Sequence, residues 1–458
     1  MSESIGGSGK GMKLHTKILI GLLIGAVLGI SANVFLGGKS PEVEGVNKYL
    51  AGPAGQIFLR LLFMIVIPLV FSSIALGVAG LGDLKRVGRV GGKAIGYFLA
   101  STALAATLGL VIVSLVRPGE RIPEATRTEL MATYATDASS KVEAAATSDF
   151  GVQTLVNIVP RNPVKSAADL DMLGIIFFAM IFGAALTMIA AERANPMLHV
   201  LEAINDAVIK IVEMVMRLAP YGVAALIFGV TSRFGFDVLR LLGWYVVVVI
   251  GALLIHVFVN LSLIIRFLIG MSPWKFFARV RSALVTAFST SSSSATLPTA
   301  LATAEENLGI PKQIAGFVLP LGSTMCMNGT ALFEGITVIT LAQAFGVQLG
   351  FGQMIAVMVM SVITAVGAAG VPGGSIPLLV GVLTMFGVPA EGIAIVLGVD
   401  RILDMSRTTV NVCGDLTATA WVAKVEGVWN SSMVPAVEGI LESGGKLDES
   451  PGWPAPKV

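Results

Sequence analysis

Apolar segments long enough to cross a bilayer follow one another along the first part of the chain, and this pattern constrains the fold more than any other feature. They lie at residues 17–37, 55–82, 96–116, 170–192, 197–230 and 238–268. A spanning helix needs about 20 predominantly apolar residues. The 458 residues are 55% hydrophobic and only 13% charged. Because backbone polar groups must be satisfied inside lipid, the sequence predicts an all-α polytopic membrane protein.

Basic residues predict the orientation of the first two segments. Lys10, Lys13 and Lys17 precede the first, and the loop LGDLKRVGRVGGK after the second carries four Lys or Arg residues. Positive charge favours the cytoplasmic side, so both ends of this helix pair are expected there. The first apolar run is too long for a signal-peptide core and is expected to remain as a spanning helix. The net charge of +2 gives no reason to expect a nucleic-acid partner.

Two polar stretches interrupt the apolar pattern. The third segment ends at Arg117, and residues 119–150 then form a long polar stretch that we expect to be an external loop. The fifth segment has an amphipathic start that we expect at the membrane interface, marked by Glu202, Asp206, Lys210 and Glu213.

Three later segments are apolar but broken. RSALVTAFSTSSSSATLPTALATAEENLG has two arms of about ten residues joined by the hydroxyl run Ser289 to Ser294, and each arm is too short to span a bilayer. MIAVMVMSVITAVGAAGVPGGSIPLLVGVLTMFGV has two arms around AAGVPGGS. Both predict re-entrant hairpins whose tips meet protein, water or ligand. Between them, FVLPLGSTMCMNGTALFEGITVITLAQAF is an apolar helix interrupted at Gly322 to Gly329, and such paired interruptions indicate a transporter's binding site.

Each interruption also has an ordinary explanation. A serine run is usually a flexible linker, and GVPGG alone indicates only a turn. The pair Asn328-Gly329 most often marks a hairpin turn. The position of these stretches between apolar arms, rather than between domains, favours the membrane interpretation.

Residues 399–424 carry charges in an apolar context. If they are helical, one face within roughly 80° holds the polar side chains of Asp400, Asp404, Thr408, Asn411 and Asp415, with Arg407 at its edge. The opposite face holds Leu403, Val410, Thr417 and Trp421. Three aspartates and one arginine do not neutralise each other, so a bound cation or a substrate ammonium is the expected counter-charge. The alternative is a structural ion pair between Asp404 and Arg407, one turn apart.

Four of these motifs together resemble the glutamate transporter family, the dicarboxylate/amino acid:cation symporters. They are SSSSATLP, NGTALFEG, AGVPGG and LDMSRTTVNVCGDLTATA, and YFLASTALAATLG in the third segment also fits. The resemblance, to bacterial-type members, implies eight transmembrane helices and two re-entrant hairpins, with inverted repeats, in the cell inner membrane. It also implies a homotrimer in which a transport domain moves like an elevator against a trimerisation scaffold.

The same resemblance implies a division of the chain. Its parts are a cytoplasmic tail (1–16), scaffold helices 1 and 2 (17–92), transport-domain helix 3 (93–118), a polar loop (119–168), scaffold helices 4 and 5 (169–236), the remaining transport domain (237–427) and a C-terminal tail (428–458).

The resemblance assigns substrate roles. Arg407 matches the clamp for the substrate's side-chain carboxylate, which suits a bidentate guanidinium. Asp404 matches the residue that holds the α-ammonium, so L-aspartate or L-glutamate is expected rather than a plain dicarboxylate. Further substrate contacts are expected from Thr408, Asn411, Thr330, Ser292, Ser293, Val371 and Ser375. The second hairpin is the expected gate, formed by Gly370, Pro372, Gly373 and Gly374.

Coupling is where this sequence departs from the family. The family's Asn-Met-Asp-Gly-Thr is here Cys326-Met327-Asn328-Gly329-Thr330. The thiol of Cys326 replaces an amide and so removes an oxygen ligand of Na⁺. The amide of Asn328 replaces a carboxylate and so removes a negative charge that Na⁺ favours. Ser101 and Thr102 retain the hydroxyls of this site. A second sodium site is expected from Asp415, Asn411 and carbonyls near Gly322, and a third from carbonyls around 365–368 and 324–327.

Glu334 offers a different coupling ion. It lies one turn beyond Thr330, where animal family members have a glutamate linked to proton movement, and a carboxyl buried in an apolar helix can carry a proton. The alternative is a carboxylate held by local hydrogen bonds. Proton-coupled or uncoupled transport is therefore favoured over sodium symport, and an anion-conducting channel is a further alternative. No nucleophile–base pairing is visible, so neither an enzyme nor a cofactor is expected.

Overall fold

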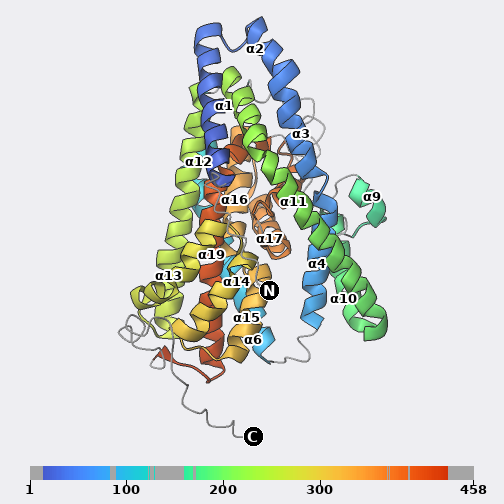
Figure 1. Cartoon of the computed structure of the whole chain (residues 1–458), viewed down its shortest axis with the longest axis vertical. Coiled ribbons are helices and arrows are strands. Elements are labelled where there is room, and N and C mark those ends of the chain that lie inside the picture. Colours follow the sequence, from blue (N-terminus) through green and yellow to red (C-terminus); the bar gives the residue numbers. More distant parts are fainter. Residues whose placement is uncertain are drawn as a thin grey trace, which may run out of the picture.

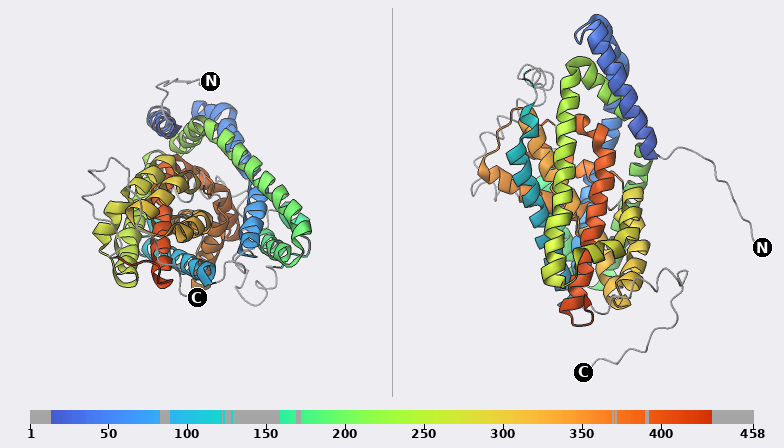
Figure 2. Two further views of the ribbon diagram at one scale, coloured as in Figure 1. Left: turned by 60° about the horizontal axis from the view of Figure 1, so that its bottom comes forward. Right: turned by 90° about the vertical axis from the view of Figure 1, so that its left-hand side faces the viewer.

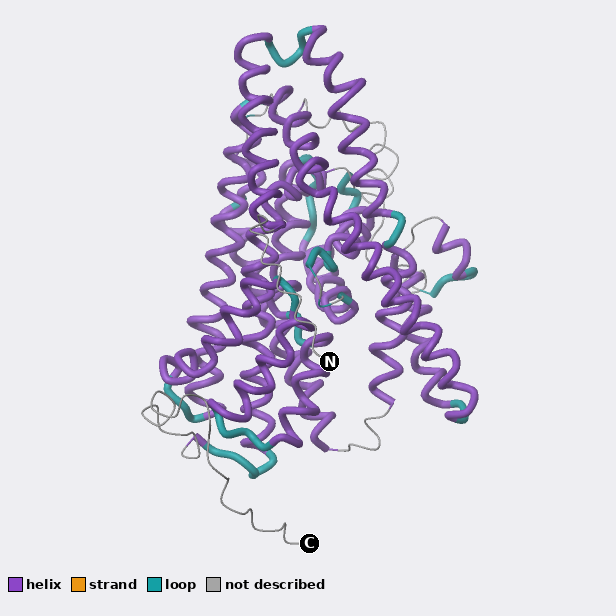
Figure 3. Tube along the Cα trace, in the orientation of Figure 1, coloured by secondary structure: helices purple, strands orange, loops and turns teal. Residues whose placement is uncertain are grey.

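The computed structural model describes residues 14–82, 89–121, 159–168, 172–368, 370, 372–389 and 392–431, together with 123 and 128. All regular secondary structure in this part of the chain is helical (Figure 3). Most of each predicted terminal tail, the centre of the basic loop and most of the polar loop lie outside the described residues. Residues 14–16, predicted as the end of the N-terminal tail, belong to the first helix.

The helices follow the predicted order. Their bounds are α1 (Leu14–Leu36), α2 (Pro41–Val46), η1 (Asn47–Ala51), α3 (Gly52–Phe63), α4 (Val66–Gly82), α6 (Arg89–Val116), η2 (Pro118–Arg121), α9 (Pro163–Ala168), α10 (Met172–Met188), α11 (Ala191–Phe234), α12 (Phe236–Ile255), η3 (His256–Leu261), η4 (Ile264–Ile269), α13 (Pro273–Thr290), α14 (Ser293–Ala302), η5 (Thr303–Asn307), α15 (Lys312–Met325), α16 (Asn328–Ala344), α17 (Phe351–Gly367), α18 (Ile376–Met385) and α19 (Ile393–Val425). Six helical stretches among the described residues are long and apolar enough to cross a membrane. This confirms a multi-pass membrane protein.

Prolines shape two of the long helices differently. The second predicted span is divided between α3 and α4 at Met64, four residues before Pro68, because a proline ring clashes with the carbonyl of that residue and offers no N–H. By contrast, α11 continues through Pro196 and Pro220. Its amphipathic start is part of the same helix, and there Lys210 Nζ pairs with Glu213 Oε2 at 2.9 Å on the exposed side.

The helices form two groups. In Figure 1, α11 runs diagonally from beside α1 to α4 and α10, and the left view of Figure 2 shows these helices, with α3, along one edge of a bundle formed by α6 and α12 to α19. The contact between α1 and α11 is close: a Cβ added to Gly21 would lie 2.2 Å from the Pro220 carbonyl oxygen. Glycine therefore allows these two backbones to approach each other.

The helix interruptions are narrower than predicted. Ser289 and Thr290 belong to α13, and Ser293 begins α14, so only Ser291 and Ser292 separate the two arms. A φ of 51° at Ser291 ends the first arm, and the Ser292 side chain caps the second. Likewise only Cys326 and Met327 separate α15 from α16, rather than all of 322–329.

The helix α19 lies inside the bundle and is enclosed on both faces. Asp400 and Asp404 are buried, and so are Leu403, Val410 and Thr417 on the opposite face. Trp421 is partly exposed and packs near Tyr97 of α6, with ring centroids 5.3 Å apart. The charges of α19 are therefore surrounded by protein.

Candidate substrate and cation sites

The tips of the two broken segments meet at the Gly370 carbonyl. Ser292 Oγ donates a hydrogen bond to this oxygen at 2.6 Å, and the Ser294 N–H donates another at 3.2 Å. A Cβ added to Gly370 would lie 2.8 Å from Ser294 Oγ and 2.9 Å from the Ser323 carbonyl oxygen. Glycine is required here because the backbone approaches its neighbours so closely.

The tip between α17 and α18 also contacts α19. The Gly373 N–H donates to Asp404 Oδ2 at 3.0 Å. Gly373 has a φ of +75°, a conformation that L side chains rarely adopt. A Cβ at this position would lie 3.4 Å from the Met216 sulfur of α11. Asp404 therefore holds the tip in a closed position at a residue whose backbone conformation favours glycine.

Four charges alternate within two turns of α19. Arg407 Nη1 lies 2.9 Å from Asp400 Oδ1, and its Nη2 lies 2.9 Å from Asp404 Oδ1. Arg401 Nη1 is 3.7 Å from Asp404 Oδ2. The Arg407 guanidinium also lies over the Phe333 ring, 4.2 Å from its centroid, which favours a cation there.

This arrangement corrects the predicted charge balance of α19. Three aspartates and one arginine were predicted on the polar face, but a second arginine, the buried Arg401, also pairs with Asp404. Its spacing of three residues from Asp404 was the available indication. Only Asp415, among the aspartates considered, lacks an ion-pair partner in the described part of the chain.

A small cavity lies between the tips and α19. Its volume is about 20 Å³, room for about one water molecule. The lining residues come from the two tips, the helix break and α19, and are Ser291, Ser293, Met327, Thr330, Ala368, Gly370, Ser375, Asp404, Arg407, Thr408 and Asn411. The structure thus brings together most of the predicted substrate residues. An amino acid can enter only if a tip moves.

Asn411 joins α19 to the start of α16. Its Oδ1 accepts hydrogen bonds from the Gly329 and Thr330 N–H groups at 2.8 and 3.3 Å, and its Nδ2 donates to Thr330 Oγ1 at 3.0 Å. The first N–H groups of a helix have no partner within it. Asn411 supplies that partner from another helix and fixes the position of the break.

Asn328 lies in a closed hydrogen-bond network. Its Nδ2 donates to Ser101 Oγ at 2.7 Å, and its Oδ1 accepts from Thr102 Oγ1 at 2.9 Å and from Cys326 Sγ at 3.7 Å. All four side chains are buried. The amide and its neighbours therefore satisfy one another as neutral groups.

Asp415 contrasts with Asn328. It is buried, and its Oδ1 has no hydrogen-bond partner among the described residues. A Cβ added to Gly322 would lie 2.8 Å from this oxygen, so the carboxylate approaches the α15 backbone near the helix break. A carboxylate oxygen is a ligand that hard cations favour.

Glu334 faces α17. The side chain is fully buried, and its Oε2 accepts a hydrogen bond from Thr364 Oγ1 of α17 at 2.6 Å. Its Oε1 has no partner in the part of the chain that the structure describes. Local hydrogen bonding therefore satisfies only half of this carboxyl. Thr364 was not among the predicted residues.

The remaining predicted tip residues are only partly described. Val371 lies outside the described residues, whereas Pro372 and Gly374 lie in the closed tip between α17 and α18. The stretches 365–368 and 324–327 lie at the ends of α17 and α15.

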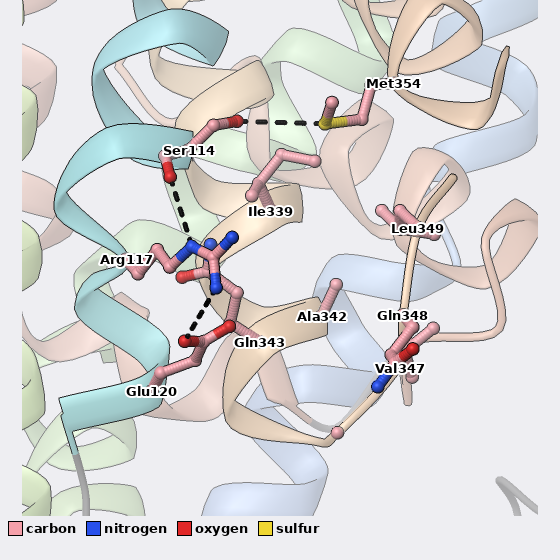
Figure 4. A pocket seen from close by; sticks show the side chains of 11 residues that line it. Ser114, Arg117, Glu120, Ile339, Ala342, Gln343, Val347, Gln348, Leu349 and Met354 are labelled. Carbon is pink, nitrogen blue, oxygen red and sulfur yellow. Dashed lines mark hydrogen bonds and ion pairs between the residues drawn. The ribbon is translucent and has the colours of Figure 1, made fainter. Parts of the chain in front are cut away.

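A larger cavity of about 460 Å³ lies apart from these residues, between the end of α6 and the loop after α16 (Figure 4). There Arg117 Nη1 pairs with Glu120 Oε2 at 3.4 Å.

Comparison with known proteins fixes the family. The model of the sodium:dicarboxylate symporter family matches residues 14–425. The chain belongs to this family. It is 36% identical over 430 residues to the proton/glutamate-aspartate symporter of Escherichia coli (strain K12), covering 94% of this chain and 97% of the relative.

Two further relatives are named for different substrates. The proton/sodium-glutamate symport protein of Geobacillus stearothermophilus is 37% identical over 419 residues, covering 91% of this chain and 95% of the relative. The C4-dicarboxylate transport protein of Bacillus subtilis (strain 168) is 31% identical over 431 residues, covering 94% and 98%. These relatives are transporters, so the prediction of a membrane transport protein that is not an enzyme is confirmed.

Proposed function

We propose that this protein is a secondary transporter of acidic amino acids, L-aspartate or L-glutamate, driven by protons and with sodium coupling weakened or lost. The observation that carries the proposal is the Arg407–Asp404 pair beside a cavity closed by two hairpin tips. A guanidinium suits a carboxylate, and a carboxylate suits an ammonium. The names of the relatives from E. coli and G. stearothermophilus support an acidic amino acid.

Substrate binding would exchange internal partners for external ones. When the tip at Gly373 opens, its N–H leaves Asp404 Oδ2, which then accepts the substrate ammonium. Arg407 can turn part of its guanidinium from Asp400 to the side-chain carboxylate of the substrate. Thr408, Thr330 and the Ser293 region line the remaining space. A plain dicarboxylate would bring a negative charge and no ammonium to Asp404, which disfavours the substrate named for the B. subtilis relative.

Alternating access follows from the same elements. We assign the second hairpin (α17 and α18) as the gate, and α6 with α12 to α19 as an elevator-type transport domain moving against α1, α3, α4, α10 and α11. This gives eight transmembrane helices and two re-entrant hairpins, assembled as a homotrimer in the cell inner membrane. A family member's architecture of inverted repeats supports this assignment.

The coupling proposal rests on two buried groups. The Asn328 network is neutral and internally satisfied, so it offers Na⁺ no counter-charge. Glu334 has one carboxyl oxygen without a partner in the described structure, and desolvation favours its neutral form. A proton on Glu334 would compensate part of the negative charge that the substrate brings.

A second candidate is sodium-coupled symport through the remaining sites. The free Oδ1 of Asp415 beside the α15 backbone favours this alternative. It retains a charged oxygen ligand that the Asn328 site lacks.

Uptake into sealed vesicles tests the proposed function. The purified full-length protein would be reconstituted, and labelled aspartate followed under an inward proton gradient, an inward sodium gradient or neither. Accumulation above equilibrium with the proton gradient is expected. Accumulation with the sodium gradient alone would favour the second candidate, whereas mere equilibration under every gradient would indicate a channel or uncoupled carrier.

A further inference from the structure

Arg401 is a buried arginine that the substrate site does not use directly. It is 7% exposed and lies three residues before Asp404 on α19. Its Nη1 is 3.7 Å from Asp404 Oδ2, and its Nε and Nη1 make no hydrogen bond among the described residues. A guanidinium carries five N–H donors. Burying it with so few partners is costly, so its retained charge needs a physical reason.

The reason lies in the charge sum of α19. Asp400, Arg401, Asp404 and Arg407 contribute two negative and two positive charges within one connected set of ion pairs. Without Arg401 this buried set would carry a net charge of minus one, and an unbalanced charge is far more costly in a low-dielectric interior than a balanced one. Arg401 therefore allows the site to close without an added cation.

The contact between Arg401 and Asp404 also lies beside the proposed gate. Asp404 Oδ2, the atom nearest to Arg401, is the atom that accepts the Gly373 N–H at 3.0 Å. An ammonium group approaching Asp404 would meet the same oxygen. Arg401 can thus balance Asp404 while the tip is closed, from the side of the helix that the cavity does not include.

We propose that Arg401 is a built-in counter-charge for Asp404, replacing one mobile cation that the closed, loaded site would otherwise require. The inference rests on the proposed function, because it concerns aspartate binding at Arg407 and Asp404. Arg401 is a positioning residue, since it contacts Asp404 and lines no part of the cavity. An opened tip would expose Asp404 to water, whereas the closed tip does not, so the missing charge in a variant would be felt whenever the tip closes, both in the empty protein and when substrate binds.

The test is the sodium dependence of aspartate affinity in Arg401→Gln. Titration calorimetry on the full-length protein in detergent would measure Kd over a wide NaCl range at constant pH, with choline chloride holding ionic strength constant. Compared with the wild type, the plot of log Kd against log [Na⁺] is expected to steepen by about one, which is one extra cation bound with the substrate. Arg401→Lys should keep the wild-type slope because it keeps the charge.

Matched controls separate charge from structure. Arg240→Gln on α12 removes an exposed arginine and is expected to change neither slope nor affinity. Thermal unfolding of ligand-free protein gives a second measurement: Arg401→Gln should lower Tm, and Arg401→Gln with Asp404→Asn should recover it by restoring neutrality. An unchanged slope in Arg401→Gln with unchanged Tm, or a slope in Arg401→Lys equal to that in Arg401→Gln, would overturn the inference. A steep slope already in the wild type would instead contradict the proposed coupling.

Discussion

Asn328 Nδ2 donates a hydrogen bond to Ser101 Oγ at 2.7 Å, joining the start of α16 to the middle of α6. The same amide accepts from Thr102 on the next position of α6. Two helices distant in sequence are therefore connected by neutral groups where the family pattern places a carboxylate. The connection provides a structural reason for expecting a change in coupling.

Restoring the carboxylate at this position should restore a cation requirement. In Asn328→Asp, the Ser101 and Thr102 hydroxyls and the new carboxylate would offer Na⁺ three oxygen ligands, and the unpaired buried charge would favour a bound cation. We expect aspartate affinity in this variant to increase with NaCl but not with choline chloride, measured by titration calorimetry. A variant that binds aspartate equally well in both salts would show that Asn328 does not determine sodium coupling.

Removing the guanidinium of Arg407 should abolish recognition of acidic substrates. Arg407→Ala leaves Asp400 buried without its ion-pair partner and leaves Asp404 with Arg401 alone. Breaking a buried pair costs roughly 3–5 kcal/mol, more than about a hundredfold in Kd. Uptake of labelled aspartate into vesicles would measure the loss, with size-exclusion chromatography confirming assembly. Normal aspartate uptake would contradict the assigned role.

A side chain at Gly373 should impair closure of the gate. The φ of +75° costs an L-residue roughly 1–2 kcal/mol, and the added Cβ also approaches Met216. We expect Gly373→Ala to slow aspartate uptake and Gly373→Val to abolish it. Gly316→Ala is the matched control, because a Cβ there meets open space and should leave uptake unchanged. Equal uptake in Gly373→Val and Gly316→Ala would argue against a gate at this tip.

Glu426 should contribute a pH-dependent part of the stability. Hydrogen bonds from Lys93 and then Arg89 lower the pKa of this carboxyl below its usual value. A lowered folded-state pKa stabilises the protein above the unfolded-state pKa of about 4.3, and the contribution is lost as the pH falls through the folded-state value. Glu426→Gln should therefore lower the free energy of unfolding at neutral pH by about 0.5–1 kcal/mol. Chemical unfolding at several pH values would measure the difference, which should disappear in acid. A constant difference would exclude the ion pairs as its cause.

Periodicity and segment length predicted most of the helices because lipid permits few alternatives. The position of α19, the helix pairs α13–α14 and α17–α18, and the break before Asn328 could therefore be inferred from apolar arms and their interruptions. The exact extent of the breaks could not, since it depends on a single positive φ at Ser291 and a cap at Ser292. These are local geometries that composition does not determine.

The site was predicted less completely than the fold. Motif resemblance located Arg407 and Asp404, but nothing in it indicated that Arg401 would balance Asp404 or that Thr364 would hold Glu334. Both contacts depend on how buried side chains turn within the packed bundle. The departure from the family motif at Asn328 was visible in the sequence. The hydrogen bonds that satisfy its amide were not, because they depend on how α6 and α16 pack against each other.

The most direct test of the account is the aspartate Kd of the wild type in detergent, measured over a wide Na⁺ range at several pH values, with choline balancing ionic strength. We predict a nearly flat plot of log Kd against log [Na⁺], and an affinity that increases as pH falls because substrate binding takes up a proton. Glu334→Gln, which cannot take up that proton, should lose the pH dependence while retaining the flat sodium plot. A steep, cooperative sodium dependence in the wild type would contradict the account and show that Asp415 and backbone carbonyls suffice to couple transport to sodium.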